Sequence, residues 1–510
     1  MARTKTKIEA QDCMPFYKGK AKADNAIRED TGSILTEFVN SIIPVNFLDN
    51  DFSQADDGSK LAYSPFENKP YPFRDNEEVN YCRVWQAGRY IGSTTIKGTT
   101  IEISPRFGDA WLVSILEDLF HFRLTENEYK SLEGGLNELM RHILWHLWVR
   151  KFAAADQYGL PRRVVKRTHQ GLQIRGHLNI RKSTIPVFTK GQVISEYREK
   201  EIDDTICRIV YKAYSILIKR KMNKFKVPAQ IQNSLNGLYS YYQGQPIGVS
   251  EHDYHDINYK NIYLSWKPLV DFSWQIIQQE AFNQFKDKVG DSYSIFLDMA
   301  EIWESFLRKK LGDGFANDGW RVLSIEECTF QIYRGKFYQR DIIPDIILER
   351  EQNGQKEYMV FDAKYKRMRG IKSSLKYSDV DRSDLFQIHT YMQYVQQNMG
   401  KVVIGGLLYP ITQKGTNDDG TAFENTDIDI ESYHSTHLFG DDRKDDTTPF
   451  IIDGILCSEE DDDKENDKED DKNVYEQAVK ENSKKLEENS KKLEENIKNM
   501  IERIKSYLKN

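Results

Sequence analysis

The sequence predicts a multidomain protein of the mixed α+β class, with an α/β domain in its second half. Three observations predict this class. Short β-like runs alternate with Gly turns through residues 78–105, as in a small β module. Apolar side chains recur at helical spacing in residues 203–222 and around 265–287. Asn353-Gly354 joins two apolar runs rich in β-branched and aromatic residues, which is the strongest short-range signal of a β-hairpin.

The composition excludes several classes of protein. The 510 residues are enough for two to four domains with a substantial core. No run of 18 apolar residues occurs, which argues against a membrane span, and the basic N-terminus has no apolar segment typical of a signal peptide. The five cysteines are scattered without CxxC spacing or histidine pairing. We therefore expect a cytoplasmic protein without structural zinc or disulfide bonds.

Changes in composition along the chain predict its domain organisation. In chain order we expect a β-containing region (1–155), a basic and helical middle region (156–290), the α/β domain (291–412), a polar extension with a last small strand (413–457), an acidic disordered linker (458–472) and a coiled-coil-like helix (473–510). No repeat of 20–50 residues is evident in the body of the chain.

Two carboxylates lie symmetrically about the predicted hairpin turn. In an antiparallel hairpin centred on residues 353 and 354, facing residues have numbers that add to 707, and Asp345 and Asp362 satisfy this condition. Their Cβ atoms are therefore expected about 4.5–5.5 Å apart. Lys364 returns to the same face of the strand as Asp362. Like charges in direct opposition are unfavourable unless a cation lies between them, so the pair predicts a bound divalent metal.

The ligand chemistry favours Mg²⁺, with Mn²⁺ as the substitute, because carboxylate oxygens with retained water suit near-octahedral coordination. Lys364 would stabilise charge that develops on a phosphate, or would position or deprotonate the attacking water. The hairpin therefore predicts metal-assisted phosphodiester hydrolysis. The alternative is a chance pattern, since PD followed by DAK is common and a strand register can slip by one residue.

Segments on both sides of the hairpin extend it to a larger α/β unit. Residues 292–311 have apolar side chains near 3.6-residue spacing and are expected to form a helix. Residues 382–398 form a second expected helix, and 401–410 are a continuous apolar run typical of a buried strand. The expected order of elements is α-β-β-β-α-β.

This order resembles the core of the PD-(D/E)xK nucleases. The resemblance implies an acidic residue on the first helix, where Glu304 is the position that fits. In the RecB-like branch, a Gln and a Tyr four residues apart lie on the helix after the lysine, which here implies Gln387 and Tyr391. The alternatives are a solvated Glu304, and a Gln387/Tyr391 pair that only caps the sheet.

A basic stretch marks the middle of the chain. Residues 161–182 contain seven basic side chains and no acid, namely Arg162, Arg163, Lys166, Arg167, Arg175, Arg181 and Lys182. Contact with DNA phosphates, a solvated linker and a surface for a protein partner are the three interpretations.

The carboxyl-terminal part is charged and heptad-like. Residues 458–472 carry ten acidic and three basic side chains, which accounts for the whole net charge of −7, so basic patches elsewhere can still face DNA. Residues 473–510 have an apolar residue every seven positions, with Ser483 and Ser490 weakening the companion seam. We expect a short coiled coil that self-associates or pairs with a partner helix; a lone solvated helix is the alternative.

Several segments together resemble the McrC family, the nuclease subunits of McrBC-type 5-methylcytosine-dependent restriction systems. The matching segments are GRYIGSTTIKGTTIEISPRFGD (88–109), YGLPRRVVKRTHQGLQIRGHLNIRKS (158–183), DDTICRIVYKAY (203–214), DMAEIWESFL (298–307) and PDIIL…VFDAKYKR…DLFQIHTYMQY. They span roughly residues 80–410 in the family's order. The extension after residue 412 departs from the family.

The resemblance implies a division of labour. An N-terminal region would dock on a hexameric AAA+ GTPase of McrB type and stimulate it, and the motor would translocate on DNA that contains modified cytosine. The chain has no GxxxxGK[ST] motif, as expected if the motor is a separate polypeptide. Asp345, Asp362 and Lys364 would be the catalytic residues, the two acids and Glu304 would hold the metal, and Gln387 and Tyr391 would support them.

Two competing functions remain open on the sequence. One is a non-catalytic adaptor that activates an AAA+ motor and keeps the nuclease fold only as a scaffold. The intact acid–acid–Lys triplet argues against it, since a degenerate site is expected to lose a member. The other is an autonomous repair-type nuclease, which would cleave DNA without a partner or nucleotide.

Overall fold

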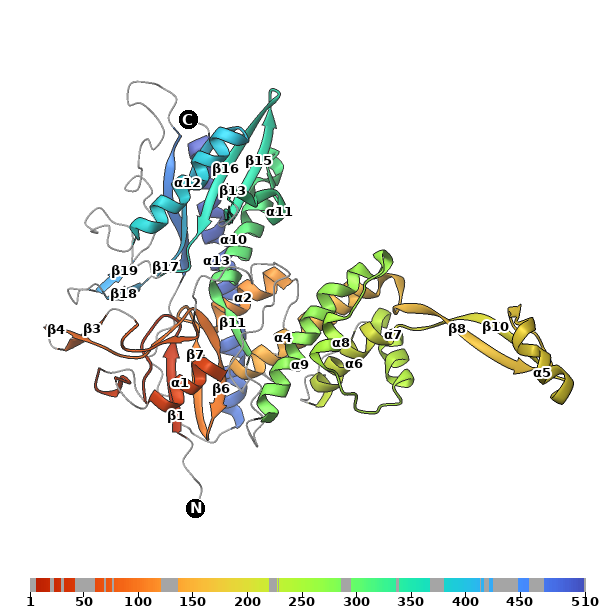
Figure 1. Cartoon of the computed structure of the whole chain (residues 1–510). Helices are drawn as coiled ribbons and strands as arrows, with labels where there is room; N and C mark the ends of the chain where they lie inside the picture. The colour runs from red at the N-terminus through yellow and green to blue at the C-terminus, as the bar shows by residue number, and fades with distance from the viewer. Residues whose placement is uncertain are drawn as a thin grey trace, which may run out of the picture. The chain divides into compact units, whose positions relative to one another are not determined.

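The structure is a computed structural model, shown in Figure 1. It describes residues 6–18, 23–28, 32–41, 60–67, 70–75, 78–120, 136–219, 227, 229–285, 295–335, 339–366, 380–412, 414–416, 422–424, 448–457 and 472–508. The chain divides into two compact units, one of residues 1–138 with 294–510 and one of residues 139–293. The expected class, a mixed α/β multidomain protein, is confirmed.

The first unit contains a four-stranded sheet built from distant parts of the sequence. In spatial order its strands are β1 (Thr6–Gln11), β7 (Thr99–Ser104), β6 (Tyr90–Ile96) and β11 (Ile295–Asp298). β1 runs parallel to β7, and the other pairs are antiparallel. Around the sheet are α1 (Gly32–Ser41), α2 (Asp109–Phe120) and the ribbons β2 (Ala62–Tyr63) with β5 (Gln86–Ala87) and β3 (Tyr71–Asp75) with β4 (Glu78–Cys82).

The segment after this sheet corrects one expectation. Residues 295–298 form β11 and not the first turn of a helix, because they pair with β6 and place Phe296 in the buried core. The helix α10 (Met299–Phe315) begins directly after the strand. The Asp298 side chain accepts a hydrogen bond from the N–H of Ala300 at 3.0 Å, which satisfies a donor of the first helical turn. The same residue therefore ends the strand and caps the helix.

The second sheet of this unit has five strands. In spatial order they are β12 (Arg321–Val322), β15 (Ile346–Gln352), β16 (Gln355–Ala363), β17 (Lys401–Thr412) and β20 (Phe450–Cys457). β15 is antiparallel to both of its neighbours, β12 and β16, whereas β17 runs parallel to both β16 and β20. The nearby short elements are α11 (Ile325–Cys328) and the pairs β13 (Phe330–Arg334) with β14 (Gln339–Ile342) and β18 (Lys414–Thr416) with β19 (Ala422–Glu424).

Helices cover the five-stranded sheet (Figure 1). α12 (Arg382–Asn398) has the bounds that the sequence predicts, and it packs on β16 and β17. The core under it contains Ile347 and Val360 from the hairpin and Ile388 and Val395 from the helix. α10 contacts β15 and β16. Because residues two apart on a strand share a face, Asp345 and Asp362 lie on the face that α12 covers.

Two features lie beyond residue 412, where we expected the α/β domain to end. β20 joins the same sheet beside β17, and all eight of its residues are buried. The last helix, α13 (Lys472–Leu508), packs against α2, α10 and β20. The acidic run at 458–471 lies outside the described residues.

The contacts of α13 correct the expected coiled-coil seam. The seam residues Leu493, Ile497, Met500 and Ile504 are all buried within this chain. Arg503 binds the buried carboxylate of Asp453 on β20 at 2.8 Å, which fixes the helix on the sheet. The apolar residues at heptad spacing form a helix face that packs within the chain. Such a face can be buried against other elements of the same chain as well as in a coiled coil. These four buried side chains are therefore not available for self-association.

The second unit combines helices with a long antiparallel ribbon. Its helices are α4 (Leu136–Ala155), α6 (Asp204–Lys219), α7 (Ala229–Tyr241), α8 (Glu251–His255) and α9 (Lys267–Phe285). The ribbon has strands β8 (Arg162–Gly171), β10 (Val193–Ile202) and β9 (His177–Leu178), with α5 (Ile180–Lys190) between β9 and β10. Trp148 and Trp266 are fully buried among the helices.

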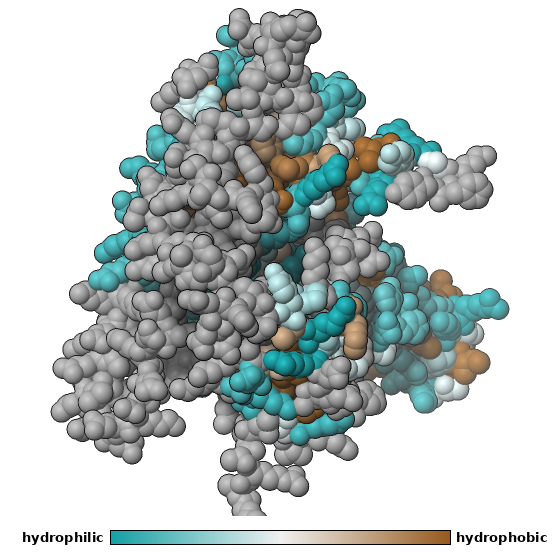
Figure 2. Space-filling view, turned by 90° about the vertical axis from the view of Figure 1, so that its left-hand side faces the viewer, coloured by the Kyte–Doolittle hydropathy of each residue, from teal (hydrophilic) through white to brown (hydrophobic). Residues whose placement is uncertain are grey.

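One face of the molecule is largely polar where its residues are described. On the face drawn in Figure 2, most of the coloured side chains are hydrophilic and the apolar ones occur in small groups. Within the described part of the chain, no helix is long and apolar enough to cross a membrane.

Candidate active site on the β15–β16 hairpin

The hairpin has the register that its turn residues predict. Asn353 and Gly354 have φ values of 53° and 76°, the positive values that a type I′ turn requires. The ladder pairs Ile346 with Phe361, and one further step places Asp345 opposite Asp362. The expected register, with paired numbers adding to 707, is therefore confirmed. A local turn signal brings two carboxylates together from positions 17 residues apart.

Asp345 is held at the entrance of β15 by contacts at both of its ends. Its Oδ2 atom accepts a hydrogen bond from the N–H of Ala363 at 2.7 Å, directly beside Asp362. Its main-chain oxygen accepts a hydrogen bond from Nη1 of Arg308 at 2.7 Å. Burial is the largest cause that raises the pKa of Asp345 well above its ordinary value, and the charges of Asp362 and Glu304 raise it further.

Asp362 is fully buried, and its Oδ1 atom accepts no hydrogen bond within the described structure. Its close polar contact is an ion pair, in which Nζ of Lys364 lies 2.7 Å from Oδ2. A buried carboxylate normally has all its lone pairs satisfied, because an unsatisfied one costs about 1–3 kcal/mol or more. The free lone pairs of Oδ1 therefore fit a ligand for a cation.

Lys364 is fixed from three sides. Its main-chain N–H donates to the oxygen of Leu408 at 2.9 Å, so the residue continues the pairing of β16 with β17. Its Nζ donates to Oε1 of Gln387 at 2.8 Å, and Nε2 of Gln387 donates to the hydroxyl of Tyr391 at 2.8 Å. Burial lowers the pKa of Lys364, but the Asp362 and Asp345 carboxylates outweigh it, so that the net pKa is raised and the amine stays charged.

Glu304 lies on α10 within the electrostatic reach of the hairpin acids. Burial raises its pKa to about 7, and the Asp362 and Asp298 charges act in the same direction. The charge of Arg308, one helical turn further on, opposes this rise. The four predicted residues Glu304, Asp345, Asp362 and Lys364 thus form one electrostatic cluster, and Gln387 and Tyr391 complete it from α12.

The donor set suits a hard cation with retained water. Mg²⁺ is commonly held by one or two carboxylates and several water molecules, and two facing aspartates supply that set. In the described residues, no three His, Cys, Asp or Glu side chains are grouped to hold a metal ion. Metal binding by Asp345 and Asp362, and a direct metal contact of Glu304, stay predictions.

A family model matches more than half of the chain. The family described as "McrBC 5-methylcytosine restriction system component" matches residues 85–410. The chain belongs to this family. No curated protein matches.

Two solved structures match this McrBC component. One is the "Refined half-complex from tetradecameric assembly of Thermococcus gammatolerans McrB AAA+ hexamers with bound McrC", at 15% identity and a TM-score of 0.45, covering 89% of this chain and 95% of the other. The second is the "Cryo-EM structure of the Thermococcus gammatolerans McrBC complex", at 14% identity and a TM-score of 0.33, covering 61% and 88%.

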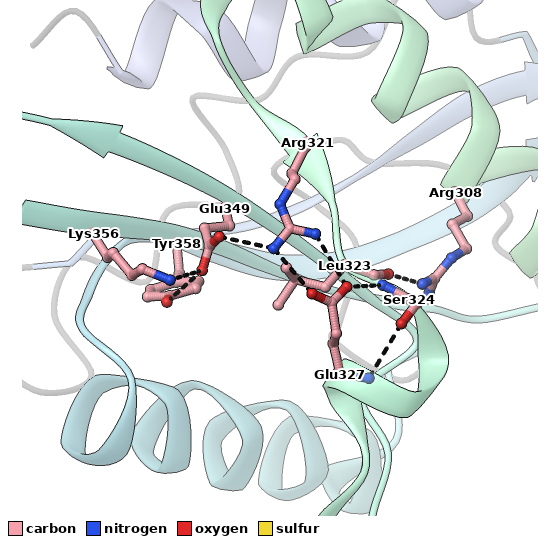
Figure 3. Close-up of polar contacts among 8 residues, drawn as sticks. All are labelled: Arg308, Arg321, Leu323, Ser324, Glu327, Glu349, Lys356 and Tyr358. Carbon is pink, nitrogen blue, oxygen red and sulfur yellow. Dashed lines mark hydrogen bonds and ion pairs between the residues drawn. The ribbon is translucent and has the colours of Figure 1, made fainter.

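Two residues of this McrBC family member belong to the site although the sequence analysis missed them. Arg308 connects α10 to the start of β15, because its Nη1 donates to the main-chain oxygen of Asp345. Its Nη2 donates to the main-chain oxygen of Leu323 (Figure 3). Asp384 is buried and lies 2.7 Å from Nζ of Lys366 and 3.8 Å from Nζ of Lys364. Helical spacing could have found both, since Arg308 follows Glu304 by four residues and Asp384 precedes Tyr391 by seven.

The seven basic residues predicted to contact DNA or a partner belong to the ribbon of the second unit, and all of them are exposed. The strand register brings acidic side chains of β10 opposite some of them, which offsets part of their positive charge. Arg163 faces Glu201 in the ladder, and Nε of Arg167 binds Oε1 of Glu201 at 2.9 Å. Nζ of Lys182 lies 3.2 Å from Oε1 of Glu196. A basic run in the sequence is therefore a ribbon of mixed charge in the fold.

The far end of the ribbon is apolar and exposed. On α5 the side chains of Ile180, Ile185 and Phe188 are 75%, 74% and 86% exposed, and Leu172 at the end of β8 is 82% exposed. Single exposed apolar residues are ordinary, but a group on one short element marks an interaction surface.

Proposed function

We propose that this chain is the DNA-cleaving subunit of a McrBC-type restriction complex. In this proposal the α/β domain is a PD-(D/E)xK nuclease that hydrolyses phosphodiester bonds with a divalent metal, and a hexameric AAA+ GTPase both drives it and is stimulated by it. The observation that carries the proposal is the pair Asp345 and Asp362, which face each other with Oδ1 of Asp362 unsatisfied and Oδ2 paired with Lys364.

Each residue of the cluster then has a task that follows from its contacts. Lys364 presents a fixed positive charge, because its amine is held between Asp362 and Gln387. Such a charge stabilises the negative charge that develops on a phosphate oxygen in the transition state. Tyr391 orients the Gln387 amide and thereby the amine. Glu304, with a pKa near 7, can hold or release a proton at neutral pH.

Mg²⁺ held by Asp345 and Asp362 would polarise a phosphoryl oxygen and lower the pKa of a bound water. The chain's own contribution is a rigid pair of ligands. Arg308 and the N–H of Ala363 fix Asp345, and pairing with β17 fixes the end of β16. A site held in this way meets the requirement that catalytic groups be placed to within about 0.5 Å.

The ribbon of the second unit would contact the motor. Its exposed apolar tip supplies the buried centre that a protein interface needs, and the mixed charges along the strands supply a polar rim. DNA that contains modified cytosine would reach the hairpin as the motor moves it. In this scheme the motor polypeptide, and not this chain, recognises the modified cytosine.

The test is DNA cleavage by the reconstituted complex with Mg²⁺ and GTP. Asp362→Asn and Lys364→Met are expected to lower the cleavage rate by at least about a hundredfold while the partner's GTPase stimulation persists. The matched control is Glu349→Gln on the same hairpin, where Oε2 binds Nζ of Lys356 at 2.9 Å (Figure 3). That acid–lysine pair lies away from the facing aspartates, so the control should cleave normally.

The outcomes separate the competing functions. Loss of cleavage in both site variants, with cleavage intact in the control, supports the nuclease. Stimulated GTPase without nicking under Mg²⁺ or Mn²⁺, in the unaltered complex, favours the adaptor. Cleavage by the isolated chain without nucleotide favours an autonomous nuclease.

A further inference from the structure

We infer that Arg106, at the corner between β7 and α2, is a positioning residue for the candidate active site. This inference rests on the proposed nuclease function and adds a residue that lies outside the cluster on the hairpin. Arg106 follows β7, a strand of the four-stranded sheet, and its side chain contacts Tyr365, the residue after Lys364.

The first step is the contact between Arg106 and Tyr365. The guanidinium carbon of Arg106 lies 4.4 Å from the centroid of the Tyr365 ring, and Nη2 is 3.4 Å from the Tyr365 main-chain oxygen. Tyr365 is the immediate neighbour of Lys364, and both residues are largely buried. Arg106 therefore clamps the chain directly after β16, where the direction of the Lys364 side chain is decided.

Placing Arg106 at this corner buries an ion pair, which costs desolvation free energy. Both Arg106 and Asp12 are almost fully buried, and their ion pair has Nε 3.2 Å from Oδ2. Oδ1 of Asp12 also accepts the N–H of Arg106 at 2.7 Å. Burying two charges is expensive, and well-packed apolar residues of similar volume often give equal or higher stability. Stability alone thus does not account for the pair, whereas a fixed clamp on Tyr365 does.

The third step is a row of aromatic rings that starts at the same corner. Phe107 packs edge-on against Tyr365 with centroids 6.5 Å apart, and it contacts Trp111 at 5.0 Å. Trp111 stacks on Trp303 at 6.1 Å, and Trp303 precedes Glu304 on α10. The corner thus packs on the sequence neighbours of two site residues, Lys364 through Tyr365 and Glu304 through Trp303.

The start of α10 is tied to the same sheet by charge. Nε of Arg89 lies 3.0 Å from Oδ2 of Asp298, the residue that caps the helix. The helix that carries Glu304 is thereby anchored at its first turn by an ion pair and along its side by Trp303. A displacement of the corner would change the relation between Glu304 and Lys364 without touching either side chain.

The principal test is the double variant Asp12→Asn/Arg106→Met, which removes both buried charges and leaves no unpaired ion. Two readouts are used. Reaction of Lys364 with acetic anhydride, followed by mass spectrometry, reports how firmly the amine is held without any need for DNA cleavage. We expect it to rise about tenfold, which corresponds to the loss of about 1.4 kcal/mol of restraint. The turnover number for DNA is expected to fall about 10- to 100-fold with little change in KM, as for a misplaced catalytic group.

The matched control is Arg350→Met. The guanidinium carbon of Arg350 lies 4.4 Å over the Trp320 ring, the same distance as in the Arg106 contact, and Arg350 is likewise paired with an acid, Glu357. This control loses a comparable interaction away from the site. Lys356, which is exposed, serves as the internal reference for labelling.

A second pair of variants covers the case in which the double variant does not fold. Tyr365→Leu removes the ring under Arg106, whereas Tyr365→Phe retains it. The inference predicts that Phe restores the labelling rate and turnover that Leu loses. It is overturned if Lys364 labelling and turnover in both test sets match those of Arg350→Met. If the unaltered complex does not cleave DNA, the proposed function fails, and Lys364 labelling still decides the positioning role.

Discussion

The amine of Lys364 lies 2.7 Å from Oδ2 of Asp362, with only Ala363 between them in the sequence. Alternate residues of a strand point to the same face, so the two charges meet without a turn or a loop. Asp345 joins them from the facing strand through its hydrogen bond to the N–H of Ala363. The backbone of one strand thus fixes Asp362 and Lys364 relative to each other, and one cross-strand hydrogen bond adds Asp345.

The orientation of Lys364 should depend on Gln387 and Tyr391 as a chain. Gln387→Ala removes the acceptor of the amine and is expected to lower DNA cleavage about tenfold, the ordinary scale for a supporting hydrogen bond. Tyr391→Phe should have a smaller effect, because it removes only the partner that orients the amide. The double variant should be no slower than Gln387→Ala. Additive losses in a double-mutant cycle would show that the two residues act separately.

The pKa of Glu304 predicts a pH dependence of stability in the metal-free protein. Its folded-state pKa of about 7 exceeds the ordinary value of 4.5, so the folded state binds the proton more tightly than the unfolded state. Stability should therefore fall as pH rises from 4.5 to about 7, by up to about 1.4 kcal/mol per pH unit. Glu304→Gln should flatten this slope in urea unfolding with EDTA present. Part of the slope should remain, because the pKa of Asp345 is also raised. An unchanged slope would contradict the assignment.

The packing of α13 on α10 predicts a steric conflict. A Cβ atom added at Gly314 would lie 2.4 Å from Cδ1 of Ile501, closer than such atoms approach. Gly314→Ala is therefore expected to lower the free energy of unfolding by about 1–3 kcal/mol. Ile501→Val removes that Cδ1 atom, so the double variant should lose less than the sum of the two single losses. Gly319→Ala would be a poor control because of its φ of 80°. Full additivity in chemical denaturation would show that the helices do not meet there.

The apolar tip of the ribbon predicts a defect in partner activation without a defect in folding. Phe188→Ser should leave the melting temperature unchanged, because the side chain is 86% exposed, but should strongly reduce stimulation of the motor's GTPase. Tyr333→Ser is the matched control, since Tyr333 is 56% exposed on β13, outside both the ribbon and the N-terminal region expected to dock on the motor. A salt-dependent loss of DNA binding with GTPase stimulation intact would instead assign the ribbon to phosphate contact.

Local signals explain which parts of the fold could be predicted. The hairpin register follows from Asn353-Gly354, because both residues accept the positive φ that sets a two-residue turn. The bounds of α12 follow from its apolar periodicity and a breaking Gly400. The candidate site was predictable for the same reason, since Asp345, Asp362 and Lys364 all lie on one hairpin.

The rest depends on partners distant in the sequence. β1 pairs with β7 in a parallel register, which no turn specifies. Residues 295–298 have an apolar pattern that a helix or a strand can use, and pairing with β6 decides between them. The contact of Arg106 with Tyr365 joins residues 259 positions apart and carries no periodic signal.

The order in which the five-stranded sheet is assembled has a consequence for a growing chain. β15 and β16, with both aspartates, leave the ribosome well before β20 and the buried turns of α13. Domains fold as units once their parts are available, so the core that packs on the hairpin closes only after Phe450 and Ile452 of β20 have emerged. A nascent chain stalled before β20 is therefore expected to be inert toward DNA. Under the proposed function, synthesis therefore imposes a delay between making the two aspartates and completing the core that holds them.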